Sequence, residues 1–288
     1  MMHKTIVVVI LFLFLASVGF SFVPAWREIH ERADRITLSE ALGDVQKNPS
    51  SPEALYALAL VYLNAYKINE AEEVFEKMSA LDAGNLAARW GKAEILRRRH
   101  KFDEAQGILE TIIKEDPLYA PAYTTLGYML FDKKEYEYSI RLAVRVLKMG
   151  RERVDLTNYT RAYLIIGGAK GILADEGGPF SKLFNGTQIL SYLKKAEKLQ
   201  PRSAGVLFGL GSFYSLAPAV AGGDKAKGLI YLENVIKVDP LFVDGYARLA
   251  QVWGRRGDKE KYDFYLKKAL ELDPQNELAL RVKKDNVR

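Results

Sequence analysis

The stretch Val243–Asn276 reads VDGYARLAQVWGRRGDKEKYDFYLKKALELDPQN, and it decides the fold. Apolar residues recur in it every three or four positions, which is the period of an amphipathic α-helix. The pattern predicts one helix over 244–256 and a second over 258–272, with Gly257 turning the chain between them and Pro274 ending the second. Two short amphipathic helices cannot bury both apolar faces alone, so the pattern predicts neighbouring copies of the same unit.

Comparable units recur along the chain at a period of 34 residues. Pro49 and Pro117 lie 68 residues apart, which is twice the 34 residues between Pro240 and Pro274. The small residue that opens the second helix recurs with the same step, at Ala71, Ala105 and Ser139. This spacing predicts six helix pairs, at 52–85, 86–119, 120–153, 154–203, 204–242 and 243–276, of which the fourth and fifth carry insertions.

The units resemble the tetratricopeptide repeat family, whose pattern places Leu-Gly or Leu-Ala and Tyr in the first helix, Ala and an aromatic residue in the second, and then Pro. That pattern is carried by Leu58, Ala59, Tyr62, Ala71 and Phe75 in the first unit, by Leu126, Gly127 and Tyr136 in the third, and by Leu210, Gly211 and Tyr214 in the fifth. The resemblance implies an all-α fold, an α-solenoid with a right-handed superhelix in which about six repeats each contact mainly their neighbours. We expect residues 26–51 to form a lead-in helix and residues 277–288 a capping helix.

Residues 1–25 are predicted to target the chain for export. A short basic start is followed by Thr5–Ala25, which carries no charge and has an almost purely aliphatic and aromatic centre. This is typical of a signal peptide, and the run is also close to the length that spans a bilayer, so retention as an N-terminal anchor stays open. We therefore expect an exported, periplasmic or extracytoplasmic protein, associated with the inner membrane through residues 5–25 if they are not cleaved.

Two units depart from the plain repeat. In the fourth, we expect a helix over 159–173 followed by a loop over 175–186, in which Phe180 and Phe184 are too apolar for a simple tether. In the fifth, the extra residues are 217–221 and include Pro218. The following Gly223-Asp224 matches Gly257-Asp258 of the sixth unit, which favours a turn glycine and a helix N-cap over a phosphate or metal site. A similar proline and Gly-Gly-Asp step occurs in the T-component proteins of bacterial periplasmic TRAP transport systems, which is a local resemblance.

Composition and motifs predict binding rather than catalysis. The net charge of +6 is modest for 288 residues and does not indicate a nucleic-acid partner, while the absence of cysteine excludes disulfides and thiolate sites. The three histidines are not spaced as a metal set, and no hydrolase, phosphate-loop or complete dinucleotide motif is present. We expect no catalytic residue, no metal and no cofactor.

The family resemblance implies a concave groove lined by the first helix of each repeat. Carried onto this chain, the groove positions are Tyr56, Leu60, Asn64, Trp90, Glu94, Arg97, Arg98, Thr124, Tyr128, Asp132, Phe208, Ser212, Gln251 and Arg255. Aromatic residues are frequent among them, as in peptide-binding grooves. The alternative is that an N-terminal or loop helix covers some of these residues, or that they pack across the superhelix.

These observations lead to two hypotheses about function. The first is a non-enzymatic scaffold whose groove binds a protein or peptide partner in the cell envelope. The second is an accessory periplasmic component of a TRAP-type solute transport system, with a small organic ligand held between the fourth and fifth repeats. The oligomeric state stays open.

Overall fold

A computed structural model describes residues 24–285, with all their side chains except those of Pro179, Phe180 and Leu183. This part of the chain holds fifteen α-helices and no strand. Six antiparallel pairs follow one another: α4 (Pro52–Asn64) with α5 (Ile68–Leu81), α6 (Leu86–Arg98) with α7 (Phe102–Glu115), α8 (Ala120–Asp132) with α9 (Tyr136–Met149), α10 (Leu156–Glu176) with α11 (Pro179–Leu199), α12 (Ala204–Leu216) with α13 (Lys225–Val238), and α14 (Val243–Arg255) with α15 (Lys259–Leu272). The helix α16 (Glu277–Asp285) follows the last pair. The all-α solenoid predicted from the sequence is confirmed.

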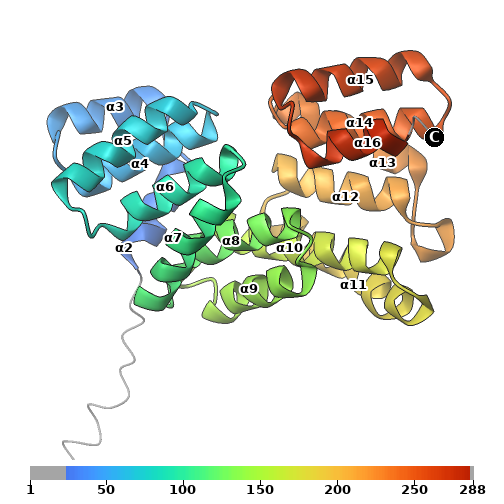
Figure 1. Cartoon of the computed structure of the whole chain (residues 1–288), viewed down its shortest axis with the longest axis horizontal. Helices are drawn as coiled ribbons and strands as arrows, with labels where there is room; N and C mark the ends of the chain where they lie inside the picture. Colours follow the sequence, from blue (N-terminus) through green and yellow to red (C-terminus); the bar gives the residue numbers. More distant parts are fainter. Residues whose placement is uncertain (1–23, 286–288) are drawn as a thin grey trace, which may run out of the picture.

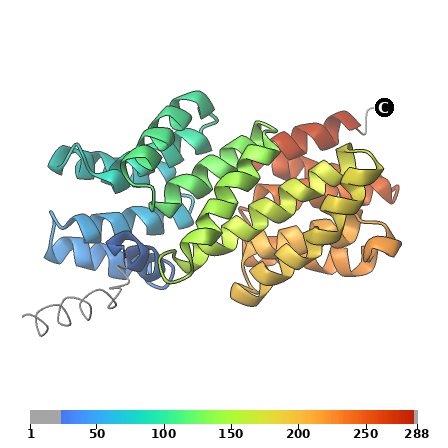
Figure 2. The same cartoon turned by 90° about the horizontal axis from the view of Figure 1, so that it is seen from below.

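The helix pairs curve into two arms joined by a base. One arm contains the helices up to α7, the base is made of α8–α11, and the second arm runs from α12 to α16 (Figure 1). Seen from below, the long helices α10 and α11 lie between the two arms (Figure 2). The first helices of the repeats therefore face a common concave side.

Small residues and caps shape each pair as the sequence predicts. The Ser51 side chain accepts a hydrogen bond from the Ala54 N–H, and Pro52 occupies the first turn of α4. A Cβ added to Gly211 of α12 would lie 2.8 Å from the Leu232 side chain of α13, so the close approach of these two helices requires glycine. Buried apolar residues form one large cluster from α2 to α10 and three smaller clusters between α10 and α16.

The single lead-in helix expected over 26–51 is wrong, because the segment forms two helices. These are α2 (Ala25–Ala33) and α3 (Leu38–Lys47). A capping box at Thr37 starts the second one: the Thr37 side chain accepts from the Glu40 N–H, and the Glu40 carboxylate accepts from the Thr37 N–H. This break allows α2 to leave the stack of helices and enter the concave side. The predicted leader, residues 1–25, lies outside the described residues except for Pro24 and Ala25.

The loop expected over 175–186 is also wrong. The helices α10 and α11 continue through most of that segment as a long hairpin, and Gly177-Gly178 alone form the turn because Pro179 already occupies the first turn of α11. The fifth-repeat insertion instead forms a short 3₁₀ turn over Ala219–Ala221. Asp224 then caps α13 by accepting from the N–H groups of Ala226 and Lys227, as predicted for an N-cap. Within residues 24–285, no helix is both long and apolar enough to cross a membrane.

Candidate functional site

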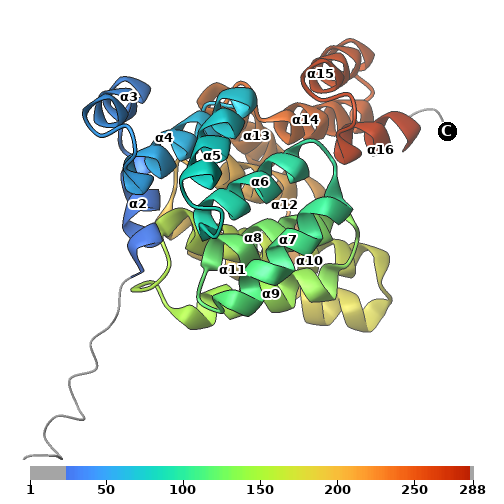
Figure 3. The same ribbon diagram turned by 60° about the vertical axis from the view of Figure 1, so that its left-hand side comes forward.

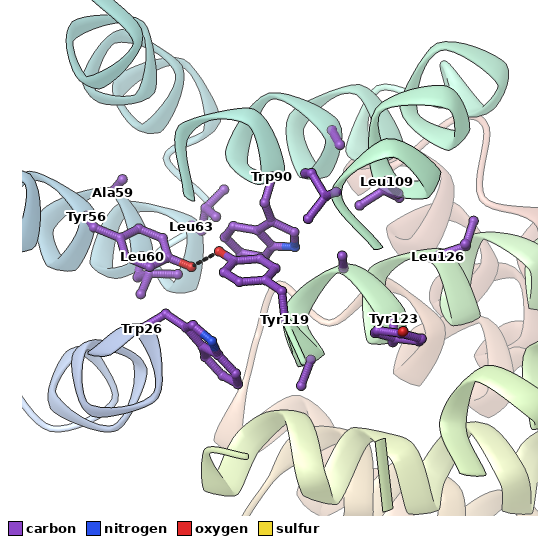
Figure 4. Close-up of a cluster of buried hydrophobic side chains, with 14 of the residues drawn as sticks. Trp26, Tyr56, Ala59, Leu60, Leu63, Trp90, Leu109, Tyr119, Tyr123 and Leu126 are labelled. Carbon is purple, nitrogen blue, oxygen red and sulfur yellow. Dashed lines mark hydrogen bonds between the residues drawn. The ribbon is translucent and has the colours of Figure 1, made fainter. Parts of the chain in front are cut away.

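The helix α2 lies in the N-terminal half of the concave face, against α4 and α10. One side of it is buried through Trp26, His30 and Ala33, which are spaced as neighbours on a helix. The Trp26 ring meets Tyr119 edge to face at 5.4 Å, and the His30 ring lies 5.4 Å from Tyr56. Figure 4 shows Trp26 pointing from α2 towards Tyr119. We call this region, walled by α4, α6 and the N-terminal ends of α8 and α10, the N-terminal half of the concave face.

A buried hydrogen-bond network fixes α2 in this position. His30 Nε2 lies 2.6 Å from the Tyr56 hydroxyl, which lies 2.9 Å from the Tyr119 hydroxyl (Figure 4). On the other side of the ring, Asn158 Nδ2 donates to Asp155 at 2.8 Å and lies 3.4 Å from His30 Nδ1. Because a carboxylate only accepts, Asn158 presents its N–H₂ group here, so His30 Nδ1 is the acceptor and Nε2 carries the proton. Burial lowers the pKa of His30, which is consistent with this neutral form.

The buried carboxylates of this half are held in two ways: Glu94 pairs with two arginines, whereas Asp155 accepts hydrogen bonds from Asn158 and makes no ion pair among the described residues. The Glu94 carboxylate accepts from Arg97 at 2.8 Å and from Arg98 at 2.7 Å, and Arg98 also donates to the Leu63 carbonyl at 2.9 Å. Burial opposes ionisation of Glu94, but the two guanidinium groups outweigh it and hold the pKa of that carboxyl well below its usual range. A buried charge is tolerated when it is paired and hydrogen-bonded, so this cluster is complete without a ligand.

Further polar contacts hold the exposed side of α2. Arg151 donates to Glu31 at 2.7 Å, and Thr157 donates to Asp34 at 2.6 Å. Asn64 also reaches Asp34, at 3.4 Å. A cavity of about 20 Å³ remains at the C-terminal end of α2, which is room for a water molecule rather than for a peptide.

Most of the predicted groove residues of this half are covered by the chain itself, while Asn64 is exposed and Arg97 and Arg98 are half-buried. Tyr56, Leu60, Trp90, Glu94 and Thr124 are all buried, and the Thr124 hydroxyl donates to Asn158 Oδ1 at 2.5 Å. The N-terminal helix thus covers this part of the set, as one sequence alternative proposed. Whether any predicted residue contacts a partner stays a prediction.

The C-terminal half of the concave face differs in its charges. It is lined by Tyr128 and Asp132 of α8 and by α12, α14 and α16. Asp132, Asp244 and Arg248 are half-buried, and none of them makes an ion pair within the described part of the chain. Asp244 accepts from the Asn276 amide at 2.8 Å, and Arg248 donates to Gln251 at 2.5 Å.

Burial perturbs the pKa values of these groups and outweighs the effect of nearby opposite charges, such as Arg97 on Asp132 and Asp244 on Arg248. It raises the pKa of Asp132 to about 6 and also raises the pKa of Asp244. It lowers the pKa of Arg248 to about 10. Each shift favours the neutral form, which is the reverse of the effect on Glu94. A ligand that pairs with these three charged groups would stabilise their ionised forms.

The remaining predicted groove residues lie in this half. Phe208 packs against Phe242 at 5.5 Å and under the Arg248 guanidinium at 5.6 Å. The Ser212 hydroxyl is buried without a hydrogen-bond partner, as is Arg248 Nε. Gln251 is half-buried and Arg255 is exposed.

The described insertion residues, Phe184 and Pro218, are exposed. Phe184 of α11 is 67% exposed, and the Lys170 ammonium lies 5.2 Å from the centre of its ring. Pro218 is exposed at the start of the 3₁₀ turn. The Phe180 side chain lies outside the described residues.

Sequence reasoning missed four residues of the concave face. Trp26 and His30 lie in its N-terminal half, and Asp244 and Arg248 lie in its C-terminal half. Asp244 holds the second position of its repeat, one of the groove positions, and could have been included by the same rule. Arg248 is a charged residue next to the apolar Leu249-Ala250 pair, which is a further signal. For Trp26 and His30, the i, i+4 aromatic pair ahead of the first repeat was the available sign.

Comparisons with known proteins agree with this architecture. Tetratricopeptide repeat family profiles match residues 65–127 and 243–276. The solved structure described as the APC/C hetero-tetramer Cut9–Hcn1 is similar with a TM-score of 0.60 and 16% identity, over 90% of this chain and 48% of that chain. A tetratricopeptide repeat protein from Parabacteroides merdae is similar with a TM-score of 0.54 and 15% identity, over 87% of this chain and 91% of that chain. No curated protein matches the chain in sequence. The chain is a tetratricopeptide repeat protein.

Proposed function

We propose that this chain is a non-enzymatic scaffold that binds a protein partner outside the cytoplasm, through the C-terminal half of its concave face. The tetratricopeptide repeat fold is that of an interaction scaffold. The N-terminal half is already occupied by α2, so an extended partner segment has no free surface there. The proposal therefore moves the binding site from the whole predicted groove to the part of it that lies beyond α2.

The unpaired charges of the C-terminal half carry this proposal. A buried carboxylate or guanidinium without a partner is unfavourable. A ligand that supplies the opposite charge stabilises it, and this contributes favourably to the free energy of binding. Asp132 and Asp244 can accept from a lysine, an arginine or backbone N–H groups of a partner. Arg248 and Arg255 can donate to a carboxylate or to backbone carbonyls. A polypeptide segment that carries both signs of charge fits this set.

Site-specific photo-crosslinking in the producing cell tests the proposal. A photoreactive amino acid at Gln251 lies on the concave face, and the same residue at Lys237 lies on the exposed surface of α13. We expect a discrete protein adduct from position 251 and none from position 237. The adduct should be lost in an Asp132→Ala, Arg248→Ala variant that still folds by circular dichroism. Equal adducts from both positions would place binding elsewhere.

Export is the second part of the proposal, and it is supported by the uncharged run of residues 5–25. Cell fractionation and determination of the mature N-terminus test it. Recovery outside the cytoplasm, either beginning near residue 25 or retained with the membrane fraction, is the expected result. A full-length chain in the cytoplasm would contradict it.

A small organic ligand, as in an accessory role in solute transport, is the alternative occupant. The observation that favours it is the presence of both signs of charge, Asp132, Asp244 and Arg248, in the interior of the C-terminal half. Native mass spectrometry of the purified protein distinguishes the two, because a small ligand adds a discrete mass of a few hundred daltons or less. A retained organic acid or amino acid would favour this alternative, and its absence with a protein adduct at Gln251 would exclude it.

A further inference from the structure

Two contacts join the arms of the molecule, and both join the same two positions of the repeat. The Tyr66 hydroxyl donates to Asp239 Oδ2 at 2.7 Å, and His100 Nε2 lies 3.3 Å from Asp273 Oδ2. The partners of each pair are 173 residues apart in sequence. Tyr66 and His100 are one 34-residue repeat apart, and so are Asp239 and Asp273. We call this pair of contacts the clasp; Figure 3 shows the arm of α3–α7 beside the arm of α13–α16.

The first arm contributes the residue that ends the first helix of a repeat. Tyr66 and His100 both adopt left-handed backbone conformations, with φ of 58° and 59°. In each case the next N–H bonds back to a carbonyl of the helix, Lys67 to Tyr62 and Lys101 to Leu96, both at 2.9 Å. Glycine is the residue usually found at this position of a helix end, and Gly257 occupies it in the sixth repeat with φ of 78°. Tyr66 and His100 therefore carry a side chain at a backbone position that favours glycine, and in both cases this side chain contacts the other arm.

The second arm contributes an aspartate that has a spare oxygen. Asp239 Oδ1 accepts from the Leu241 N–H at 3.0 Å, and Asp273 Oδ1 accepts from the Gln275 N–H at 2.9 Å. Asp82 and Asp116 form the same turn in the first arm, with N–H groups of Gly84 and Leu118 at 2.9 Å. Within residues 24–285, neither Asp82 nor Asp116 contacts a residue equivalent to Tyr66 or His100. The turn therefore forms without a partner for the second carboxylate oxygen, Oδ2. That oxygen is free for the clasp.

The arms are held together by polar contacts rather than by a shared core. None of the four apolar clusters of the described residues includes residues from both α4–α7 and α13–α16. Tyr66 is 41% exposed, so its contact competes with water. Contacts of this kind open at low cost compared with the separation of a packed core.

We propose that the clasp is a gate over the C-terminal half of the concave face. While it is closed, repeats one and two lie against repeats five and six and restrict entry to the surface that bears Asp132, Ser212 and Arg248. Opening the two contacts separates the arms and admits a polypeptide segment. The gate controls the same surface that the proposed function uses, but its test needs no partner, so either one can fail alone.

The absence of cysteine allows a direct test of access. Ser212→Cys places a single thiol where the native hydroxyl is buried, and its rate of alkylation by a polyethylene-glycol maleimide reports entry of a bulky molecule. In a Tyr66→Gly, His100→Gly background we expect alkylation to be about tenfold faster or more, because opening becomes more frequent. The helix ends remain favourable in this variant, since glycine suits both positions.

Lys134 supplies the matched control. It holds the same position after α8, with φ of 65°, and it contacts no aspartate within the described residues. Lys134→Gly therefore changes the same turn without changing the clasp, and alkylation should keep the parent rate. Equal rates in the parent and the double glycine variant would overturn the gate, as would equal acceleration by Lys134→Gly.

A distance measurement provides the second readout. Nitroxide labels at Glu73→Cys on α5 and Lys237→Cys on α13 occupy exposed positions on the two arms. We expect one narrow distance distribution in the parent, which becomes longer and broader in the Tyr66→Gly, His100→Gly variant and stays narrow in Lys134→Gly. An unchanged distribution in the double glycine variant would show that the clasp does not hold the arms.

Discussion

The two halves of the concave face are built from the same repeat, yet they differ in the contacts of their charged side chains. In the N-terminal half, α2 inserts Trp26 and His30 between the repeats, and Glu94 is paired with two arginines. In the C-terminal half, Asp132 and Arg248 make no direct ion pair among the described side chains. Glu94 is therefore stabilised within the first half, whereas Asp132 and Arg248 would be stabilised by a ligand of opposite charge. Buried polar atoms without a partner occur in both halves, Trp26 Nε1 in the first and the Ser212 hydroxyl in the second.

This difference also separates stability from function within one solenoid. In repeat proteins each unit contacts mainly its neighbours, so one end can be optimised for packing while the other keeps unfavourable groups. The N-terminal repeats and α2 share the largest apolar cluster, whereas the C-terminal repeats hold three smaller ones. Substitutions in the first half should therefore reduce stability more than equivalent substitutions in the second half.

The largest expected effect follows removal of the side chain that anchors α2. Trp26→Ala should lower the free energy of unfolding by about 3–5 kcal/mol, because it removes a buried ring and leaves a cavity beside Tyr119. Urea denaturation followed by circular dichroism measures this loss. Phe208→Ala, in the C-terminal half, is the matched variant, and its half-buried ring should cost about 1–2 kcal/mol. Equal losses in the two variants would remove the distinction between the halves.

The next effect concerns the charges. Glu94→Gln leaves the half-buried Arg97 and Arg98 without their carboxylate partner, and we expect a loss of about 3 kcal/mol in the free energy of unfolding. Asp132→Asn removes a carboxylate that has no cationic partner, so it should be neutral or stabilising by about 1 kcal/mol at pH 7. Denaturant titrations of both variants at the same ionic strength provide the measurement. A loss of equal size in Asp132→Asn would mean that Asp132 is paired in solution.

Acidification should change the two halves in opposite directions. The pKa of folded His30 lies below the usual 6.5, so the unfolded chain takes up a proton first and the N-terminal half loses stability as the pH falls below 6.5. The pKa of folded Asp132 is about 6 instead of 3.8, so the folded chain takes up a proton first and the C-terminal half gains stability between pH 6 and 4. The gain from Asp132 should be about 1 kcal/mol at pH 5.5.

Amide hydrogen exchange read by mass spectrometry at pH 7.5 and 5.5, corrected for the intrinsic exchange rate, resolves the two halves. Peptides from α2 should lose protection at the lower pH, and peptides from α8 and α14 should gain it. Asp132→Asn serves as the control, since it should reduce the gain, to which Asp244 also contributes, and keep the loss. Protection that falls in both halves would contradict the pairing described here.

The sequence predicted the repeats better than the surface they present. Prolines and small residues at a fixed step are local signals, and they located the helix pairs because each pair is a local structure. The position of α2 was not predictable in this way: the amphipathic pattern of residues 26–47 fits a helix in the stack as well as one in the groove. The Thr37-x-x-Glu40 capping box did mark a new helix start, and it was the overlooked sign.

Two other features needed the three-dimensional arrangement. The glycines and proline of the fourth repeat predicted a loop, but proline also suits the first turn of a helix, and the structure places Pro179 there. The pairing of Tyr66 with Asp239 depends on the pitch of the whole superhelix, including both insertions, which no local pattern encodes. The unpaired state of Asp132 is likewise a property of the assembled arms.

The smallest expected effect concerns a single hydroxyl group in each half. The Ser212 hydroxyl is buried without a partner, so Ser212→Ala removes an unsatisfied group and should raise the free energy of unfolding by about 0.5 kcal/mol or leave it unchanged. The Thr124 hydroxyl donates to Asn158, so Thr124→Val keeps the shape, leaves Asn158 Oδ1 unpaired and should cost about 1–2 kcal/mol. Thermal and urea unfolding of the two variants measure the difference. A destabilised Ser212→Ala variant would show that this hydroxyl already has a partner within the chain. If the partner protein binds in the C-terminal half, Ser212→Ala should also weaken its binding, while Thr124→Val should not.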